Sequence, residues 1–145
     1  MNYYKLMVAA LFFYMATKVS ATEDPTYLCV SEESTGFYYE NKSWGRAHFN
    51  VSDEKYIIRK IKENEFGFEE KETPYGVFTL GGQNPVYMCF IDEYSNDFRC
   101  KVGVGEFYFS PESGRFIKTY TAGYWDGVNN NDNTPHIARG RCSKI

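Results

Sequence analysis

The chain has 145 residues, a formal net charge of −3 at pH 7 and an aromatic content of 19%. Its 16 basic residues form no cluster and are outnumbered by 19 acidic ones. This argues against binding to nucleic acid or to anionic lipid headgroups, because both require concentrated Lys and Arg. The acidity favours a cationic protein as a partner, although it also serves solubility.

The first segment, residues 1–21, has the pattern of a cleavable secretory signal peptide. Lys5 supplies a positive charge, Leu6 to Ala16 form an apolar run, and Val19-Ser20-Ala21 offers small residues where a signal peptidase cuts. The run is shorter than the ~20 residues that a membrane-spanning helix needs. We therefore expect cleavage after Ala21, no membrane span afterwards, and a single secreted or periplasmic domain at residues 22–145.

Short runs rich in Tyr, Phe, Val, Ile and Thr follow, separated by Gly, Asn, Asp and Pro, which is the pattern of strands and turns. About eight to ten strands with closely spaced turns indicate an all-β antiparallel barrel or sandwich. We favour the barrel, because joining the first and last strands removes exposed edges. The expected strands are Tyr27–Ser31, Gly36–Glu40, Trp44–Phe49, Tyr56–Ile61, Gly76–Leu80, Val86–Ile91, Phe98–Val102, Glu106–Ser110, Arg115–Tyr124 and His136–Arg141.

Two of these segments need comment. The charge-dense stretch from Val51 to Lys71 tolerates a short helix, but Tyr56-Ile57-Ile58 is β-prone and Phe66-Gly67-Phe68 alternates like an edge strand. We predict two exposed strands there. From Arg115 onward, residues alternate with a period of two, and Phe116 and Lys118 share one face.

Four cysteines lie after the leader, at positions 29, 89, 100 and 142. An even number in an exported chain indicates two disulfides, and the absence of close cysteine pairs argues against a metal site. Three pairings are open. We favour Cys89–Cys100 within one hairpin and Cys29–Cys142 between the first and last strands, where the closed loop is longest.

No motif for catalysis, a metal or a cofactor stands out. His48 and His136 are far apart in the sequence and outside any zinc pattern. Gly103-Val104-Gly105 precedes a strand, whereas a phosphate-binding turn must open a helix. The loop at residues 126–133 is rich in Asn and Asp but does not match the helix-loop-helix calcium template. A polar turn is the alternative to calcium binding, and the sequence leaves both open.

The rim where the long strand meets this loop is the best candidate for a binding site, since loops on a rigid scaffold carry function. Tyr124, Trp125, Asp126 and Asp132 lie there. Trp44 and Trp125, with neighbouring tyrosines, are the aromatic residues suited to a sugar- or peptide-binding surface, although aromatic rings in strands are more often core.

Several motifs resemble those of a group of short exported bacterial proteins without assigned function. They are Ser34-Thr35-Gly36-Phe37, Gly105-Glu106-Phe107-x-Phe109, Gly114-Arg115-Phe116, Gly123-Tyr124-Trp125 and Asn133-Thr134-Pro135…Gly140-x-Cys142. The resemblance spans most of the chain after the leader and implies a periplasmic or extracellular location, but no activity. In size, acidity and disulfides the chain is also loosely similar to periplasmic barrel inhibitors of lysozyme, with Ser113-Gly114-Arg115 as the nearest counterpart of their inhibitory motif.

The sequence therefore predicts an exported, non-enzymatic binding protein, which engages a cationic protein or a cell-envelope component. Two alternatives remain open. One is an inhibitor of a secreted hydrolase, and the other is an enzyme with an unrecognised site.

Overall fold

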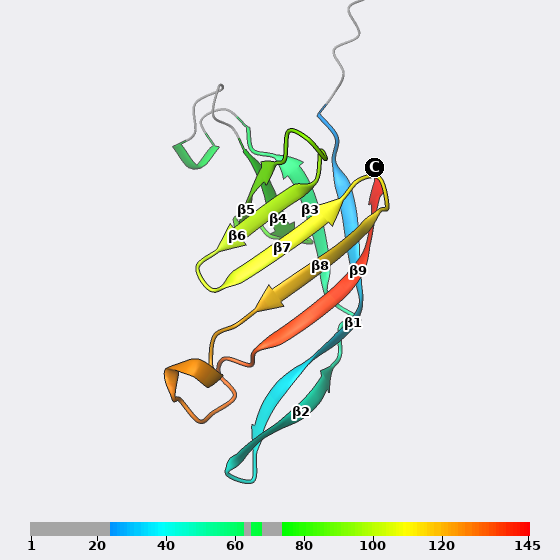
Figure 1. Cartoon of the computed structure of the whole chain (residues 1–145). Helices are drawn as coiled ribbons and strands as arrows, with labels where there is room; N and C mark the ends of the chain where they lie inside the picture. The colour runs from blue at the N-terminus through cyan, green and yellow to red at the C-terminus, as the bar shows by residue number, and fades with distance from the viewer. Residues whose placement is uncertain (1–23, 63–64, 68–73) are drawn as a thin grey trace, which may run out of the picture.

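The computed structural model describes residues 24–62, 65–67 and 74–145, so the expected leader at residues 1–21 lies outside it. The described chain forms one nine-stranded antiparallel sheet, and eight of its strands close into a barrel (Figure 1). These eight are β1 (Tyr27–Glu40), β3 (Lys55–Lys60), β4 (Tyr75–Thr79), β5 (Pro85–Ile91), β6 (Phe98–Val102), β7 (Gly105–Ser110), β8 (Arg115–Tyr120) and β9 (His136–Lys144). The extra strand, β2 (Ser43–Phe49), pairs with the second half of β1.

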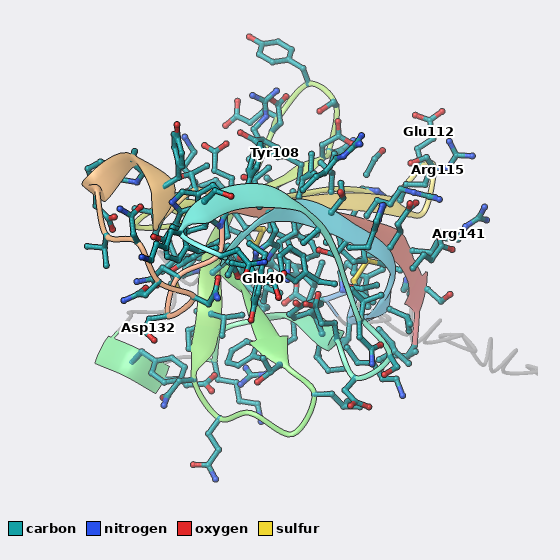
Figure 2. The ribbon with its side chains drawn as sticks, turned by 90° about the horizontal axis from the view of Figure 1, so that it is seen from below. Glu40, Tyr108, Glu112, Arg115, Asp132 and Arg141 are labelled. Carbon is teal, nitrogen blue, oxygen red and sulfur yellow. A yellow bond between two sulfur atoms is a disulfide. The ribbon has the colours of Figure 1, made fainter. Side chains whose placement is uncertain are left out.

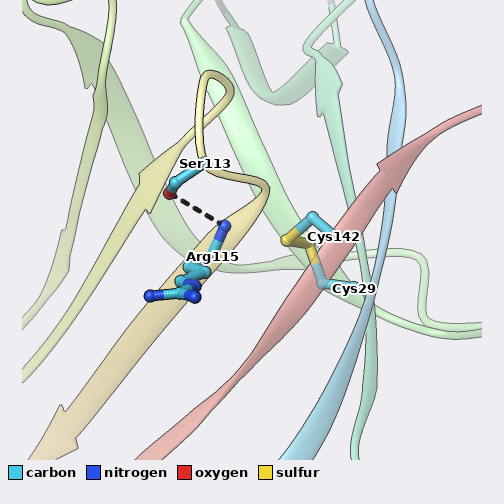
Figure 3. Close-up of a disulfide and its surroundings, with 4 residues drawn as sticks. All are labelled: Cys29, Ser113, Arg115 and Cys142. Carbon is cyan, nitrogen blue, oxygen red and sulfur yellow. Dashed lines mark hydrogen bonds between the residues drawn. A yellow bond between two sulfur atoms is a disulfide. The ribbon is translucent and has the colours of Figure 1, made fainter.

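Pairing of β1 with β9 closes the barrel, as expected from the sequence. Cys29 lies directly opposite Cys142 across this seam and is bonded to it (Figure 3). Cys89 lies opposite Cys100 in the β5–β6 hairpin and forms the second disulfide. Both favoured pairings are confirmed. The disulfides are compatible with a protein that folds outside the reducing cytoplasm, and no helix of the described residues is long and apolar enough to cross a bilayer.

Aromatic side chains fill the barrel. Inward positions of β7 and β8 bring Phe107 and Phe116 into a stacked pair with their ring centroids 4.7 Å apart. At the opposite end from β2, the ring of Tyr27 meets Phe98 and Phe109 edge-on. The period-two alternation of the sequence therefore corresponds to the inside and outside of the barrel.

The two strands expected at Tyr27–Ser31 and Gly36–Glu40 are one continuous strand, β1. The polar residues between them form a β-bulge between Ser31 and Glu33 rather than a turn. Such a bulge bends a strand without ending it. As a result, the first part of β1 pairs with β3, while Ser34 to Glu40 pair with β2, and β1 extends beyond β9 after Gly36.

Two other strand predictions were wrong. The strand from Arg115 ends at Tyr120 instead of Tyr124, and Tyr124–Asp126 form the short 3-10 turn η3. Gly123 takes a φ of 114°, which diverts the chain before this turn. The second strand expected between Val51 and Lys71 is replaced at Glu65–Gly67 by the 3-10 turn η1, in which Phe66 has a φ of 57°. Phe68 to Lys71 lie outside the described residues.

The first strand of that segment exists as β3, but it is not exposed as predicted. Tyr56 and Ile58 are buried in the core. At the end of the chain, β9 runs three residues further than expected, from Arg141 to Lys144.

Candidate functional site

An open hollow lies between the β1–β2 hairpin and the η3 turn. Its cavity volume is about 420 Å³, and its lining residues are Phe37, Trp44, Thr121, Tyr124, Trp125 and Pro135. A second hollow of about 440 Å³ shares Phe37, Thr121 and Pro135 with the first, and adds Arg46 and Ile137 among others. We call the two together the aromatic groove. Phe37, Tyr124 and Trp125 are 53%, 63% and 70% exposed, so their rings are available to a partner.

The β1–β2 hairpin forms one wall of the groove. Asn41 and Lys42 connect the strands with φ values of 52° and 61°, the left-handed conformation that a two-residue hairpin requires. Pairing of Phe37 with Arg46 and of Tyr39 with Trp44 puts these four side chains on one face. Gly36 lets β1 pass close to β9, because a Cβ there would lie 2.1 Å from the carbonyl oxygen of Pro135.

The η3 turn forms the opposite wall. Its carbonyl at Tyr124 accepts a hydrogen bond from Gly127, and the carboxylate of Asp126 accepts one from the amide of Val128. The ring of Tyr124 stacks on Phe37 with a centroid distance of 6.5 Å and meets the edge of Trp44 at 5.8 Å. The two walls thus touch through aromatic contacts.

Asparagine side chains tie the loop after η3 to the hairpin. The carboxamide of Asn131 accepts a hydrogen bond from the amide of Tyr39 and donates one to its carbonyl, both at 2.7 Å. The indole of Trp44 donates to Asn129, and the hydroxyl of Tyr120 donates to Asn133. Asn131 therefore covers the edge of β1 that extends beyond β9, while Asn129 and Asn133 hold the loop to β2 and β8.

Replacement of Asn131 by alanine should loosen the groove without unfolding the barrel. It removes two exposed hydrogen bonds, which contribute about 0.5–1.5 kcal/mol each. The amide of Tyr39 should then exchange with solvent faster, as measured by hydrogen exchange, whereas the amide of Phe107 in the core should not change. Unchanged exchange at Tyr39 would contradict the anchoring role of Asn131.

The structure brings together two of the four predicted site residues. Tyr124 and Trp125 line the groove, whereas Asp126 accepts a hydrogen bond from the amide of Val128 and Asp132 accepts one from Asn130. Asp132 lies on the side of the η3 turn, away from Arg115 and Arg141 (Figure 2). The sequence reasoning named Trp44 only as an aromatic candidate and missed Phe37 and Arg46. The Asn41-Lys42 hairpin signal pairs these positions and would have placed them on one face.

The lining of the groove is mainly aromatic and apolar. Within the described ranges, no three His, Cys, Asp or Glu side chains are grouped so as to hold a metal ion. His136 contacts the carbonyl of Thr134 through Nδ1, at 2.8 Å, and stacks on Tyr120. Gly103 and Val104 connect β6 to β7, as a hairpin turn does.

The Ser113-Gly114-Arg115 segment is held tightly to the barrel. The carbonyl of Gly114 accepts a hydrogen bond from the amide of Cys142, next to the seam disulfide, and the amide of Arg115 donates to the hydroxyl of Ser113 (Figure 3). This short turn does not form a long insertion loop.

A separate ionisable cluster lies inside the barrel. The ammonium of Lys118, only 6% exposed as a residue, contacts the carboxylate of Glu54 and the hydroxyl of Tyr56, each at 2.8 Å. Ser31 also donates to Glu54. Burial alone would raise the pKa of Glu54, but the hydrogen bond and the charge of Lys118, together with the hydrogen bonds of Ser31 and Tyr56, outweigh burial and lower it. Burial, followed by the nearby carboxylate, raises the pKa of Tyr56. Each of these side chains bonds to another member of the cluster, so we regard it as structural.

Comparison of the chain with family models, with curated proteins and with solved structures gave no match. The functional argument therefore rests on the groove itself.

Proposed function

We propose that the protein is an exported, non-catalytic binding module that holds an apolar stretch of a partner polypeptide in the aromatic groove. The observation that supports this most directly is the convergence of Phe37, Trp44, Tyr124 and Trp125 around one hollow. Large exposed rings on a rigid scaffold are typical of binding hot spots, because they bury much area at a small entropic cost.

The lining of the groove favours a polypeptide over a glycan. Sugar recognition combines ring stacking with hydrogen bonds to the hydroxyl groups. Here, the carboxamide oxygens of Asn129, Asn131 and Asn133, which could accept such bonds, are engaged within the protein, as is the amide nitrogen of Asn131. The rest of the groove presents mainly ring and methyl carbon. Apolar side chains of a partner match this surface better.

Export supports the same proposal. The leader-like pattern at residues 1–21 and the two disulfides are both expected of a protein that meets its partner outside the cytoplasm. The N-terminus of the protein recovered from the host's culture medium or periplasm, read by mass spectrometry, should be Thr22.

Replacement of Trp125 by alanine should weaken partner binding by about tenfold or more, since truncation of a hot-spot aromatic costs at least ~2 kcal/mol. The probe is a random-peptide phage library, selected on the immobilised protein, with the affinities of the enriched peptides measured by fluorescence anisotropy. Tyr94→Ala is the matched control, because Tyr94 is an aromatic residue that is 98% exposed in the β5–β6 loop, outside the lining of the groove.

Peptides that bind both variants alike would refute the groove as the binding site. Retention of the protein on insoluble chitin or peptidoglycan, lost in Trp125→Ala but not in Tyr94→Ala, would assign the groove to glycans instead.

A further inference from the structure

The outer edge of β2 is a free sheet edge next to the aromatic groove. Among the described residues, β2 pairs with β1 alone. The corresponding edge of β1 is covered, since the amide of Phe37 donates to the carbonyl of Pro135 and Asn131 bonds the backbone of Tyr39. One strand of the hairpin is therefore capped while the other is left open.

The register fixes which backbone groups of β2 point outward. Glu40 and Ser43 flank the two-residue turn, so they form a hydrogen-bonded pair, and alternate pairs along the hairpin do the same. The backbones of Phe37 and Tyr39 bond away from β2, as this phase requires. The residues of β2 opposite Tyr39, Phe37 and Thr35 must then direct their backbone N–H and C=O groups away from β1, to the free edge. These residues are Trp44, Arg46 and His48.

The free edge is also locally basic, although the chain is acidic overall. Lys42 and Arg46 lie along it, and the segment Ser43–Phe49 contains no acidic residue. Three exposed arginines on other strands have carboxylate partners, namely Arg99, Arg139 and Arg141, whereas Arg115 on β8 forms no salt bridge with the residues that the structure describes. Arg46 forms no salt bridge with any residue that the structure describes, and it lines the groove beside Phe37.

We propose that an extended, acidic segment of the partner polypeptide adds to β2 as a further strand. Its backbone pairs with Trp44, Arg46 and His48, and a carboxylate binds the guanidinium of Arg46. Side chains on the same face of the added strand pack beside Trp44, at the rim of the groove. This mode is β-strand addition, in which main-chain hydrogen bonds supply affinity and alternate side chains supply specificity. The inference rests on the proposed function, because it names the chemistry and conformation of the same partner.

The test uses the peptide library described above on the protein and on its Arg46→Glu variant. Peptides enriched on the parent protein should carry Asp or Glu at alternate positions, and Arg46→Glu should weaken them by about tenfold or more. The variant should itself select Lys or Arg at those positions. Arg99→Glu is the control, because Arg99 is an exposed strand arginine outside the groove lining and should leave the selection unchanged.

Hydrogen exchange distinguishes strand addition from simple charge pairing. On binding of an enriched peptide, the amides of Trp44, Arg46 and His48 should become protected. Those of Gly45 and Ala47, already directed at β1, should change little. N-methylation of the alternate peptide amides that face β2 should abolish binding, whereas methylation of the other set should not.

The inference would be overturned if the enriched peptides lacked acidic residues. It would also be overturned if their binding left the amide of Arg46 unprotected against hydrogen exchange. If such peptides still depend on Trp125, the proposed function holds and only the mode of binding fails. Acidic peptides that depend on Arg46 but not on Trp125 would retain the strand addition and refute the groove.

Discussion

Removal of the seam disulfide by the double substitution Cys29→Ala/Cys142→Ala should lower the free energy of unfolding by about 4–5 kcal/mol. The same change at Cys89 and Cys100 should cost about 3 kcal/mol. The difference follows from loop length, because the bonded residues are 113 apart in the sequence in the first case and 11 in the second. A longer closed loop removes more conformational entropy from the unfolded chain.

The two disulfides form a well-matched comparison. Each joins residues directly opposite each other in an antiparallel ladder, and all four cysteines are buried. The two double substitutions therefore remove similar packing. The difference between their free energies of unfolding, measured in guanidinium chloride, then reports the contribution of loop closure. Equal losses, or a larger loss for the Cys89–Cys100 pair, would show that native packing rather than loop closure dominates.

The seam disulfide and the proposed binding site lie at different parts of β1. Strand β1 holds Cys29 at one end and carries Phe37 into the groove at the other. Between them, β1 pairs with β9 as far as Gly36. If the added partner strand binds β2, its attachment is transmitted to the barrel through β1 and through the contacts of Trp44 with Asn129 and Tyr124. The Cys29→Ala/Cys142→Ala protein should consequently bind the enriched peptides as long as it remains folded, because the groove lies beyond the closed seam.

Local patterns predicted most of the barrel. Alternation placed Phe116 and Lys118 on one face, and both are buried on the inside of β8. The errors occur where a backbone irregularity decides the outcome. The residues between Ser31 and Ser34 look like a turn in composition but form a bulge, because β9 continues to pair on both sides of it. The strand from Arg115 ends at Tyr120, where its pairing with β9 ends at His136, and Gly123 then turns the chain into η3.

The groove was only half predictable for a different reason. Tyr124 and Trp125 were noticed because they adjoin an unusual loop. Phe37 joins them only through the β1–β9 seam and the Asn131 anchor, which bring together segments about 90 positions apart. Long-range register of this kind is set by barrel closure. The residue pattern of a single segment therefore cannot predict it.

Replacement of Glu54 by glutamine should destabilise the protein by about 3 kcal/mol at neutral pH, because it leaves the buried ammonium of Lys118 without its counter-charge. Lys118→Met should cost less. Methionine fills the space of the lysine stem, and Glu54, whose side chain is 29% exposed, keeps Ser31 and Tyr56 as donors. In the double variant Glu54→Gln/Lys118→Met, the cost should fall back to about that of Lys118→Met alone.

The pH dependence of this effect identifies it as ionic. The pKa of Glu54 in the folded protein is lowered from its ordinary value of 4.5, against the effect of burial, by Lys118 first and then by the hydrogen bonds of Ser31 and Tyr56. A lowered folded-state pKa means that the carboxylate stabilises the fold fully above pH ~4.5, and that this contribution is lost as the pH falls through the folded pKa. The difference in unfolding free energy between the parent protein and Glu54→Gln should therefore be largest near neutrality and shrink in acid.

Denaturant unfolding of both proteins between about pH 3 and pH 7 measures this difference directly. A constant difference across the range would mean that Glu54 acts as a neutral hydrogen-bond acceptor for Ser31 and Tyr56, and that Lys118 is compensated in another way. A difference that vanishes in acid would establish the ion pair as a built part of the barrel interior. Because the cluster is separate from the groove, Glu54→Gln should leave the affinity for groove-binding peptides unchanged wherever the variant is folded.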